Sequence, residues 1–492
     1  MITDTGMTLM TNSGSKSFQQ KIEEVSVSIE GKGLAKKARE ACRNMGIRFR
    51  DPVLQLLGTT EYSISADVGD LRWASYSDIL SRRPELFSTT NSPLKPGILT
   101  GGYLFNALSL LCLRPHLVRR LIDCHTADNH GVYGVWIMKD GRWTEQVVDD
   151  WLPMVSMTDS EMAVGCIIGH ENEIWPAIVE KAYARAWSGI DLVQLGDTVA
   201  TLRDITGAAY TIFKDLSDVD VISERLEVAL SHRWLLAVAT DTDTGMDIGL
   251  HKDELYGVVD VNRIKLSGQA TEKVLIQIMD HRKTATWKGA WSKNAHEWTL
   301  QSRSKCVNVE GCFWVELNDF AKLFSSLAVF MVQPSWLNIA LEINQQQLNK
   351  SICLLEVKTE TEISIAIDQI DPRNQSCHYN YGYSYIRITV ARLGDDQIQF
   401  IDSKLSAQKS IFLSDKLVPG RYVILLQTYW PESTSDRRFT LSVSSGEPVT
   451  LQQAAPTTVL FERLEYCLWT NFSRNNQDTF DDRSTGIPGI VW

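Results

Sequence analysis

The sequence predicts an α+β protein whose C-terminal part is an all-β sandwich. Segments with helical periodicity lie in roughly the first 200 residues, whereas short runs rich in β-branched and aromatic residues dominate beyond residue 205. From about Ser335 onward such runs recur with turn residues between them, which is typical of a β-sandwich. A chain of 492 residues exceeds what one hydrophobic core usually serves, so we expect more than one domain.

Three segments of the first part have the pattern of helices. Residues 33–45, GLAKKAREACRNM, are amphipathic and stop at Gly46, a residue suited to a helix C-cap. Residues 102–122 are apolar on most faces, which predicts a buried helix that ends or bends at Pro115. Helical periodicity returns in residues 173–186.

Strands are predicted from alternation and from turn chemistry. Residues 132–153, VYGVWIMKDGRWTEQVVDDWLP, form two strand-like runs joined at Asp140-Gly141, a dipeptide suited to a tight hairpin. An antiparallel sheet is predicted from WLLAVAT, YGVVDV and KVLIQIM. The sandwich is predicted from IALEIN, SICLLEV, EISIAI, YIRITV, IQFI, RYVILLQTY and RFTLSV.

The composition excludes several classes of protein. With 44% hydrophobic and 22% charged residues, the chain can bury large cores and is not wholly disordered. Its 60 acidic against 49 basic side chains give a net charge of −11, so we expect no nucleic-acid partner. Nine cysteines form no CxxC pair, which indicates free thiols in a reducing compartment. No apolar run approaches the ~18 residues of a membrane span, so we expect a soluble cytoplasmic protein.

Four stretches, in this order and spacing, resemble the calpains, the calcium-dependent cytosolic cysteine proteases. The first is ACRNMGIRFRDP followed by LRWASYSDILSRRPELF, and the second is WTEQVVDDWLP followed by IWPAIVEKAYAR. The third comprises YGVVDV, VLIQIMDHRKTATWKGAWSKNAHEW and GCFWVELNDFAKLF. The fourth is LVPGRYVILLQTYWPESTSDRRFTLSV. Together they cover roughly residues 40–447, and the fold that they imply is a papain-like, two-subdomain calpain core followed by a C2-like sandwich.

The resemblance also implies a domain layout. Outside the resemblance, residues 1–32 are rich in Ser, Thr and Asn with little periodicity, so we expect a mobile leader there. The calpain-like core has a helical subdomain, residues 33–203, and a β-rich subdomain, residues 204–332. A C2-like β-sandwich covers residues 333–447, and residues 448–492 form an extension of unknown role.

At the catalytic positions this sequence departs from the calpain motifs. The family needs a Cys in a Q-G-x-x-G-D-C-W motif, a His in G-H-A-Y and an Asn in N-P-W-G. Here Gly102 stands in the place of the Cys, Glu254 in that of the His and Asp280 in that of the Asn. Pro96 stands in the place of the Gln that donates to the oxyanion hole. Such a donor typically lowers the activation barrier by ~3 kcal/mol. Because glycine has no atom that can attack a carbonyl, we expect no catalytic residues here.

The positions that supply calcium ligands in the family are also replaced. They are Pro93, Thr286, Lys293 and Cys312, although the acidic residue Glu310 remains. Calcium needs six to eight oxygen ligands, so we expect no metal site in the core and no cofactor.

Other residues of the sequence are candidates to replace the missing catalytic groups. Cys112 lies about 15 Å along a continuous helix from Gly102, and Cys124-His125 lie beyond that helix. His251 could take the place of Glu254 only through a three-residue slip, which would reverse the faces of the strand.

Several residues keep two interpretations open. Glu254 and Asp280 form either an acid/base pair or solvated or Arg-paired groups, with Arg282 nearby. The aromatic residues are either packing or a ligand platform, and the acids of the sandwich loops either meet a cation or are solvated turns. The aromatic residues are Trp287, Trp291, Trp298 and Trp314; the acids are Asp368, Asp371, Asp395, Asp396 and Asp402.

Three functions follow as hypotheses. The first is a catalytically inactive calpain-like protein that binds protein partners through the degenerate cleft or the sandwich. The alternatives are an active calcium-dependent cysteine endopeptidase that uses relocated residues, and an adaptor that binds membranes or lipids through the C2-like domain.

Overall fold

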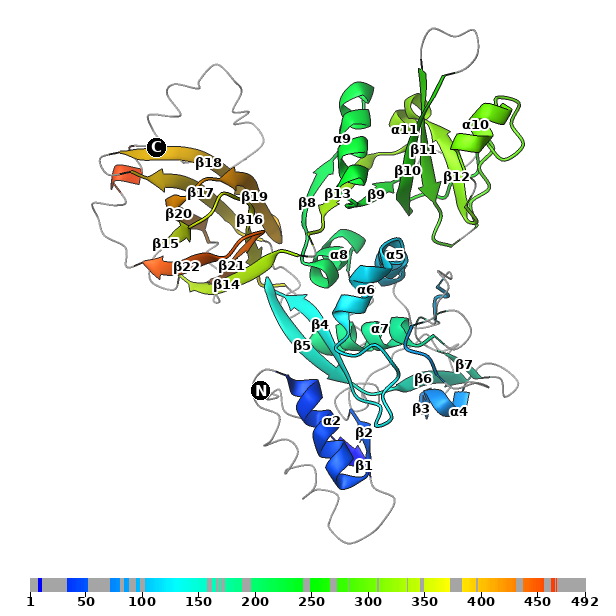
Figure 1. Cartoon of the computed structure of the whole chain (residues 1–492), viewed down its shortest axis with the longest axis horizontal. Coiled ribbons are helices and arrows are strands. Elements are labelled where there is room, and N and C mark those ends of the chain that lie inside the picture. The colour runs from blue at the N-terminus through cyan, green and yellow to red at the C-terminus, as the bar shows by residue number, and fades with distance from the viewer. Residues whose placement is uncertain are drawn as a thin grey trace. The chain divides into compact units, whose positions relative to one another are not determined.

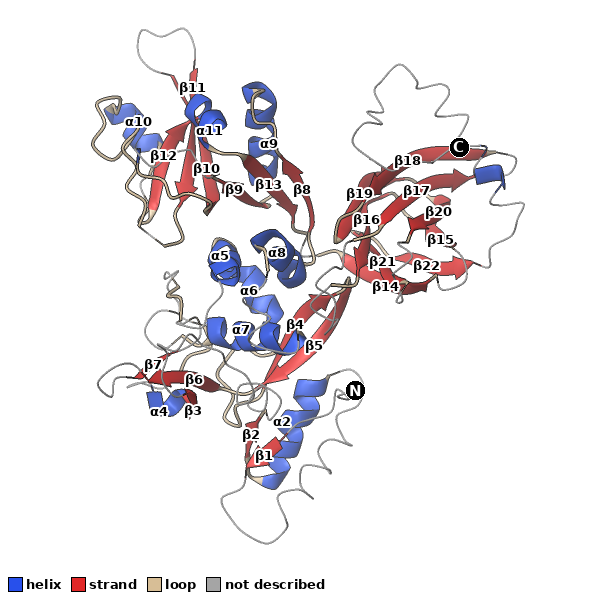
Figure 2. Ribbon diagram, turned by 180° about the vertical axis from the view of Figure 1, so that it is seen from behind, coloured by secondary structure: helices blue, strands red, loops and turns tan. Residues whose placement is uncertain are grey.

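The computed structural model divides the chain into two compact units, Met1–Pro334 and Ser335–Trp492 (Figure 1). The first unit mixes helices with sheets and the second consists mainly of strands (Figure 2), which confirms the predicted α+β class. The structure describes residues 8–10, 33–51, 71–79, 84–87, 94–97, 102–156, 162–164, 167, 169, 173–187, 196–241, 248–265, 272–282, 284–307, 309–333, 335–345, 349–371, 383–394, 397–430, 437–454, 462–464 and 466.

The first unit has two halves, which we define by their elements. The first half comprises α2 (Leu34–Met45), β2 (Arg48–Arg50), β3 (Leu71–Ser75), α4 (Tyr76–Ile79), α5 (Gly102–Leu111), α6 (Pro115–Leu121), β4 (Tyr133–Lys139), β5 (Arg142–Val148), β6 (Trp151–Ser156), β7 (Met162–Val164), α7 (Trp175–Ala186) and α8 (Thr198–Thr206). The second half comprises β8 (Ala209–Phe213), α9 (Val219–Ser231), β9 (Leu235–Ala239), β10 (Leu255–Lys265), β11 (Glu272–Met279), α10 (Leu300–Lys305), β12 (Cys312–Glu316), α11 (Leu317–Leu323) and β13 (Ser326–Met331).

The helix predicted over residues 33–45 is confirmed as α2. It ends at Gly46, whose φ of 63° is the left-handed conformation that glycine adopts at low cost. At its start the Glu145 carboxylate of β5 accepts hydrogen bonds from the backbone N–H groups of Leu34 (2.8 Å) and Ala35 (3.1 Å). An acceptor at this position satisfies N–H groups that have no partner within the helix. A short strand, β1 (Thr8–Met10), pairs with β2, and the other residues of the predicted leader lie outside the described residues.

The predicted hairpin is confirmed as β4 and β5. Asp140 (φ 47°) and Gly141 (φ 77°) both have positive φ, as a two-residue type I′ turn requires, and Lys139 pairs with Arg142. The predicted helix over residues 173–186 is confirmed as α7.

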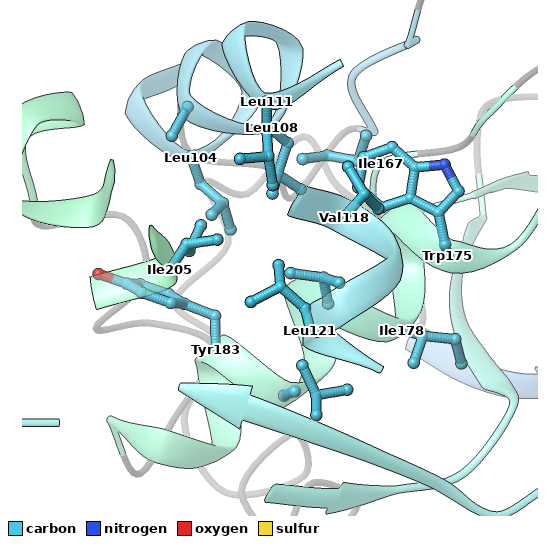
Figure 3. Close-up of a cluster of buried hydrophobic side chains, with 14 of the residues drawn as sticks. Leu104, Leu108, Leu111, Val118, Leu121, Ile167, Trp175, Ile178, Tyr183 and Ile205 are labelled. Atoms are coloured by element: carbon cyan, nitrogen blue, oxygen red, sulfur yellow. The ribbon is translucent and has the colours of Figure 1, made fainter. Parts of the chain in front are cut away.

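The apolar segment over residues 102–122 forms two helices rather than one bent helix. Helix α5 ends at Leu111, and α6 begins with Pro115 at its first position, where a missing N–H costs nothing. Side chains of α5, α6, α7 and α8 meet in one hydrophobic cluster (Figure 3), to which Leu108, Leu121 and Ile178 contribute. This cluster is the core of the first half.

The second half is a six-stranded antiparallel sheet in the order β12-β11-β10-β9-β13-β8. Helices α9 and α11 pack against it, and Ile222 and Leu226 of α9 enter a cluster with sheet residues. Leu235, Ala237 and Phe330 of the same sheet instead enter the cluster of α5 and α8. The two halves therefore share one hydrophobic cluster.

The tryptophans of the loop that follows β11 are packed into the second half. Trp287 stacks on Phe313 with ring centroids 5.7 Å apart, and Trp291 meets Trp298 edge to face at 5.0 Å. Trp287, Trp291 and Trp314 are buried. These contacts support the packing interpretation of the aromatic residues.

The second unit is a sandwich of two antiparallel sheets, with strand orders β14-β21-β16-β19 and β18-β17-β20-β15-β22. Its strands are β14 (Leu337–Asn344), β15 (Lys350–Val357), β16 (Thr361–Gln369), β17 (Tyr385–Leu393), β18 (Ile398–Ser406), β19 (Ser410–Leu417), β20 (Gly420–Tyr429), β21 (Arg438–Ser445) and β22 (Val449–Ala454). All seven predicted runs lie in strands, whereas β19 and β22 were not predicted. The two sheets enclose one hydrophobic cluster.

The segment predicted as an extension of unknown role begins as part of this sandwich. Strand β22 pairs with β15, and Leu464 is buried against Ile352, Val423 and Leu425. Because the alternate residues of β20 belong to the cluster between the sheets, Leu464 covers the outer face of the five-stranded sheet. Among the helices of the described residues, none is long and apolar enough to cross a membrane.

Candidate functional site

The first residue of α5, Gly102, lies beside a cation from the second half. A β-carbon placed on Gly102 would lie 3.6 Å from Arg282 Nη2, at ordinary van der Waals distance. Gly102 itself is exposed, and α5 is buried from Leu104 onward. The guanidinium group therefore stands at the exposed start of a buried helix.

Glu254, directly before β10, contacts groups from both halves. Its Oε1 accepts a hydrogen bond of 3.0 Å from Asn106 Nδ2, one turn into α5. Its Oε2 lies 3.2 Å from Arg282 Nη2, and the Glu254 side chain is only 10% exposed whereas that of Arg282 is 50% exposed. The buried carboxylate is thus paired with a cation and a hydrogen-bond donor, which agrees with the Arg-paired interpretation of Glu254.

Asp280, directly after β11, holds the turn that carries Arg282. Its Oδ1 accepts from the backbone N–H of Arg282 (3.0 Å), and its Oδ2 accepts from those of Thr284 (2.5 Å) and Ala285 (2.6 Å). Three backbone donors thus occupy a buried carboxylate. The sequence left two interpretations open for Asp280, an acid/base pair with Glu254 or a solvated or Arg-paired group. Asp280 instead caps a turn, and this role supports neither interpretation.

The loops before β10 and after β11 are fastened to each other. Thr286 N–H donates to Gly249 O (3.0 Å), Lys288 N–H donates to Ile248 O (2.9 Å), and Thr284 Oγ1 lies 2.9 Å from His251 Nε2. Gly249 has φ +91°, and a β-carbon there would lie 1.8 Å from Thr286 O, so only glycine fits. The Arg282 turn therefore has little freedom to move away from Glu254.

Comparison with known proteins decides the family. Residues 53–331 match the calpain family cysteine proteases. The chain belongs to the calpain family. Calpain-5 of Mus musculus is 24% identical over 484 residues, covering 83% of this chain and 74% of the relative. Calpain-8 of Rattus norvegicus is 25% identical over 321 residues, which cover 61% of this chain and 45% of the relative. The calpain-1 catalytic subunit of Homo sapiens is 27% identical over 320 residues, which cover 60% of this chain and 43% of the relative. The match thus spans less than half the length of the last two relatives.

The calpain positions assigned from the motifs meet around one guanidinium group. Gly102 and Glu254 both lie against Arg282, and Asp280 caps the turn that carries it. The assignment of these three positions to the calpain Cys, His and Asn stays a prediction. Pro96, predicted in the place of the oxyanion-hole Gln, is exposed.

The predicted calpain calcium positions are dispersed over the second half. Thr286 is exposed and its N–H bonds to Gly249, whereas Lys293 is exposed and its carbonyl accepts from Arg303 (3.4 Å). Cys312 begins β12 opposite Met279. Pro93 lies outside the described residues. Among the residues that the structure describes, no three His, Cys, Asp or Glu side chains are grouped to hold a metal ion.

The thiols considered as relocated nucleophiles are poor candidates. Burial raises the pKa of Cys112 to about 12, with a smaller contribution from Glu173. Burial raises the pKa of Cys124 to about 12 as well, with Asp123 adding to it. Since the thiolate is the nucleophile, groups that stay protonated at neutral pH are poor nucleophiles.

Two residues at this site were not found from the sequence. Asn106 follows Gly102 by one helical turn, but its partner Glu254 is 148 residues away, so no local pattern reveals it. His281 is buried between Asp280 and Arg282, and neither ring nitrogen has a hydrogen-bond partner among the described residues. Burial lowers its pKa to about 4, with Asp280 acting in the opposite direction, so the ring is neutral.

The acids predicted in the sandwich loops have partners within the protein, and two of them, Asp368 in β16 and Asp402 in β18, lie in strands instead. Asp368 accepts from Ser410 Oγ (2.6 Å), and Asp371 lies 2.9 Å from Lys409 Nζ in a buried ion pair. Asp402 accepts from the N–H of Ser403 (2.7 Å). Asp395 and Asp396 lie outside the described residues.

Proposed function

We propose that this calpain-family protein is a pseudoprotease, a non-enzymatic protein that regulates or binds protein partners. The observation that carries the proposal is the position of Arg282, whose Nη2 lies 3.6 Å from where a β-carbon of residue 102 would be. A cysteine protease needs a thiolate at the start of this helix and an imidazole that takes its proton. Here the residue at the start of the helix has no side chain, and the neighbouring space holds a guanidinium group.

The rest of the site supports the same proposal. Glu254 is paired with Arg282 and Asn106, so its oxygens are already engaged where a base would need to reach a substrate. Asp280 is engaged by three backbone N–H groups. The raised pKa values of Cys112 and Cys124 argue against an active endopeptidase that uses relocated thiols.

The partner and the binding surface are open. We propose protein partners, bound through the degenerate cleft or through the second unit, which we interpret as C2-like. A net charge of −11 argues against nucleic acid. We further propose a cytoplasmic location. A membrane or lipid adaptor that acts through the second unit is the remaining alternative, and co-sedimentation with anionic lipid vesicles separates it from the first proposal.

The proposal is tested by incubating the purified chain with casein and with a fluorogenic peptide, with and without millimolar calcium. We expect no cleavage above the buffer control. The matched control is the Cys112→Ala/Cys124→Ala variant, which lacks both relocated thiols. Calcium-stimulated cleavage that a cysteine-protease inhibitor blocks refutes the proposal, and its loss in this variant would assign the activity to the relocated thiols.

A further inference from the structure

We propose that Arg282 is a latch that holds the two halves of the first unit together without a metal ion. Such a latch would regulate the site described above. It rests on the proposed function in one respect, since both place Arg282 in the space beside Gly102. The latch is formed by four residues, two from each half. They are Gly102 and Asn106 of α5, and Glu254 and Arg282 of the second half.

The buried carboxylate of Glu254 is the centre of the latch. One oxygen receives a hydrogen bond from Asn106 of the first half, and the other pairs with Arg282 of the second half. If the halves separated, Glu254 would lose Asn106, and Arg282 would lose its place against α5. Because Arg282 and Glu254 belong to the same half, their ion pair fixes the carboxylate in place, and separation would cost the hydrogen bond that this charged group accepts from Asn106.

Glycine at position 102 leaves room for the guanidinium group. A β-carbon there meets Arg282 Nη2 at 3.6 Å, so a methyl group fits while any longer side chain competes for the same space. The absence of a side chain beyond Cα at Gly102 thus leaves the guanidinium group room beside the start of α5.

A second polar link joins the halves away from this site. Arg114, between α5 and α6, donates from Nε to Arg233 O (3.0 Å) and from Nη2 to Trp234 O (3.2 Å) just before β9. The halves also share the hydrophobic cluster to which α5, α8, β9 and β13 contribute. Among the described residues, the halves are thus joined by apolar contact and by these two polar links.

Hydrogen exchange on the full chain tests the latch, because it reports opening at α5 and β10 separately from the second unit. The variants are Arg282→Gln, Glu254→Gln and both together, measured with a chelator and with about 1 mM calcium. The matched control is the ion pair Arg263–Glu227 within the second half, whose side chains are 48% and 42% exposed. Its variants are Arg263→Gln and Glu227→Gln.

We expect Arg282→Gln to accelerate exchange in α5 and at the start of β10 about tenfold, which corresponds to ~1.4 kcal/mol. The double variant should add little to this, because both substitutions remove the same link. Arg282→Lys, which keeps the charge but not the planar fork, should lie in between, and calcium should change no rate. The control substitutions should change exchange there by less than about twofold.

Two results overturn the latch. One is an effect of Arg282→Gln no larger than that of Arg263→Gln. The other is slower exchange in α5 of the unaltered chain when calcium is added, which would show that an ion assembles the halves. Proteolytic activity would refute the proposed function and leave these exchange rates as they are, so the two failures are distinguishable.

Discussion

Glu254 Oε2 and Arg282 Nη2 lie 3.2 Å apart, with the carboxylate buried and the guanidinium half exposed. The calpain motifs assign Glu254 to the place of the family His, and this prediction puts an ion-paired carboxylate where the family has an imidazole. The same guanidinium lies against Gly102, the position assigned to the nucleophile. One arginine is thus paired with Glu254 and lies beside the space that a side chain at position 102 would enter.

Restoring a thiol alone should not restore activity. The variant Gly102→Cys places a sulfur next to Arg282, and a nearby cation lowers the pKa of a thiol. We expect alkylation by iodoacetamide at lower pH than for Cys112, whose pKa is raised to about 12. Casein should remain uncleaved, because the position assigned to the family His holds the ion-paired Glu254 rather than an imidazole that could protonate the leaving amine. Intact-mass analysis and a casein assay check both parts, and turnover by this single variant would contradict the account.

The stability of the first unit should fall in acid because of His281. Its folded pKa is lowered from 6.5 to about 4, so its stabilising effect is present above pH 6.5 and is lost as the pH falls towards 4. At or below pH 4 this lowered pKa reduces the unfolding free energy by about 3 kcal/mol relative to pH values above 6.5. His281→Gln should flatten the dependence of the unfolding free energy on pH in this range. The exposed His296 is the control, and equal slopes for His296→Gln and His281→Gln would rule out this role.

Lys181 of α7 should be a major contributor to the stability of the first half. Its buried ammonium forms an ion pair with the buried Asp149 and donates to Trp151 O (2.7 Å). Lys181→Met leaves Asp149 without its cation, which should cost about 3 kcal/mol of unfolding free energy. Denaturant unfolding measures this loss. The exposed Arg263→Met is the control and should cost less than about 1 kcal/mol.

The sequence predicted those helices and strands whose caps and turns are formed by neighbouring residues. Helix α2 has its glycine cap, and the β4–β5 hairpin has Asp140-Gly141. Helix α9 was missed because the β-rich runs around it dominated the pattern, although Ile222 and Leu226 have helical spacing and Asp218 caps its start. Strand β22 was missed because its pairing with β15 depends on residues far away in the sequence.

The candidate site was predictable in part. Motif spacing selected Gly102, Glu254 and Asp280, and the proximity of Arg282 in sequence suggested a partner for the acids. The Asn106 bond depends on the packing of α5 against β10, which no local pattern encodes. The capping by Asp280 has a local signal, since an Asp that opens a turn often accepts from the backbone N–H groups that follow.

Leu464 should be required for the stability of the second unit. It is buried on the outer face of the five-stranded sheet against Val423 and Leu425. Leu464→Ala should cost about 2 kcal/mol or more through lost burial and a cavity. Hydrogen exchange in β15 and β20 should accelerate, while α5 is unaffected. Glu462→Ala, at an exposed neighbouring position, is the control, and equal exchange in the two variants would contradict this role.

The most direct test of the absence of a catalytic thiol is covalent labelling of the unaltered chain with a peptidyl epoxide probe for cysteine proteases. The chain is incubated with the probe at neutral pH, with and without calcium, and its mass is measured intact and after digestion. With Gly102 in the place of the nucleophile and the thiols of Cys112 and Cys124 protonated, we expect no adduct under either condition. A stoichiometric, calcium-dependent adduct on any cysteine would contradict the account, because it would show that this calpain-family chain has an activated nucleophile.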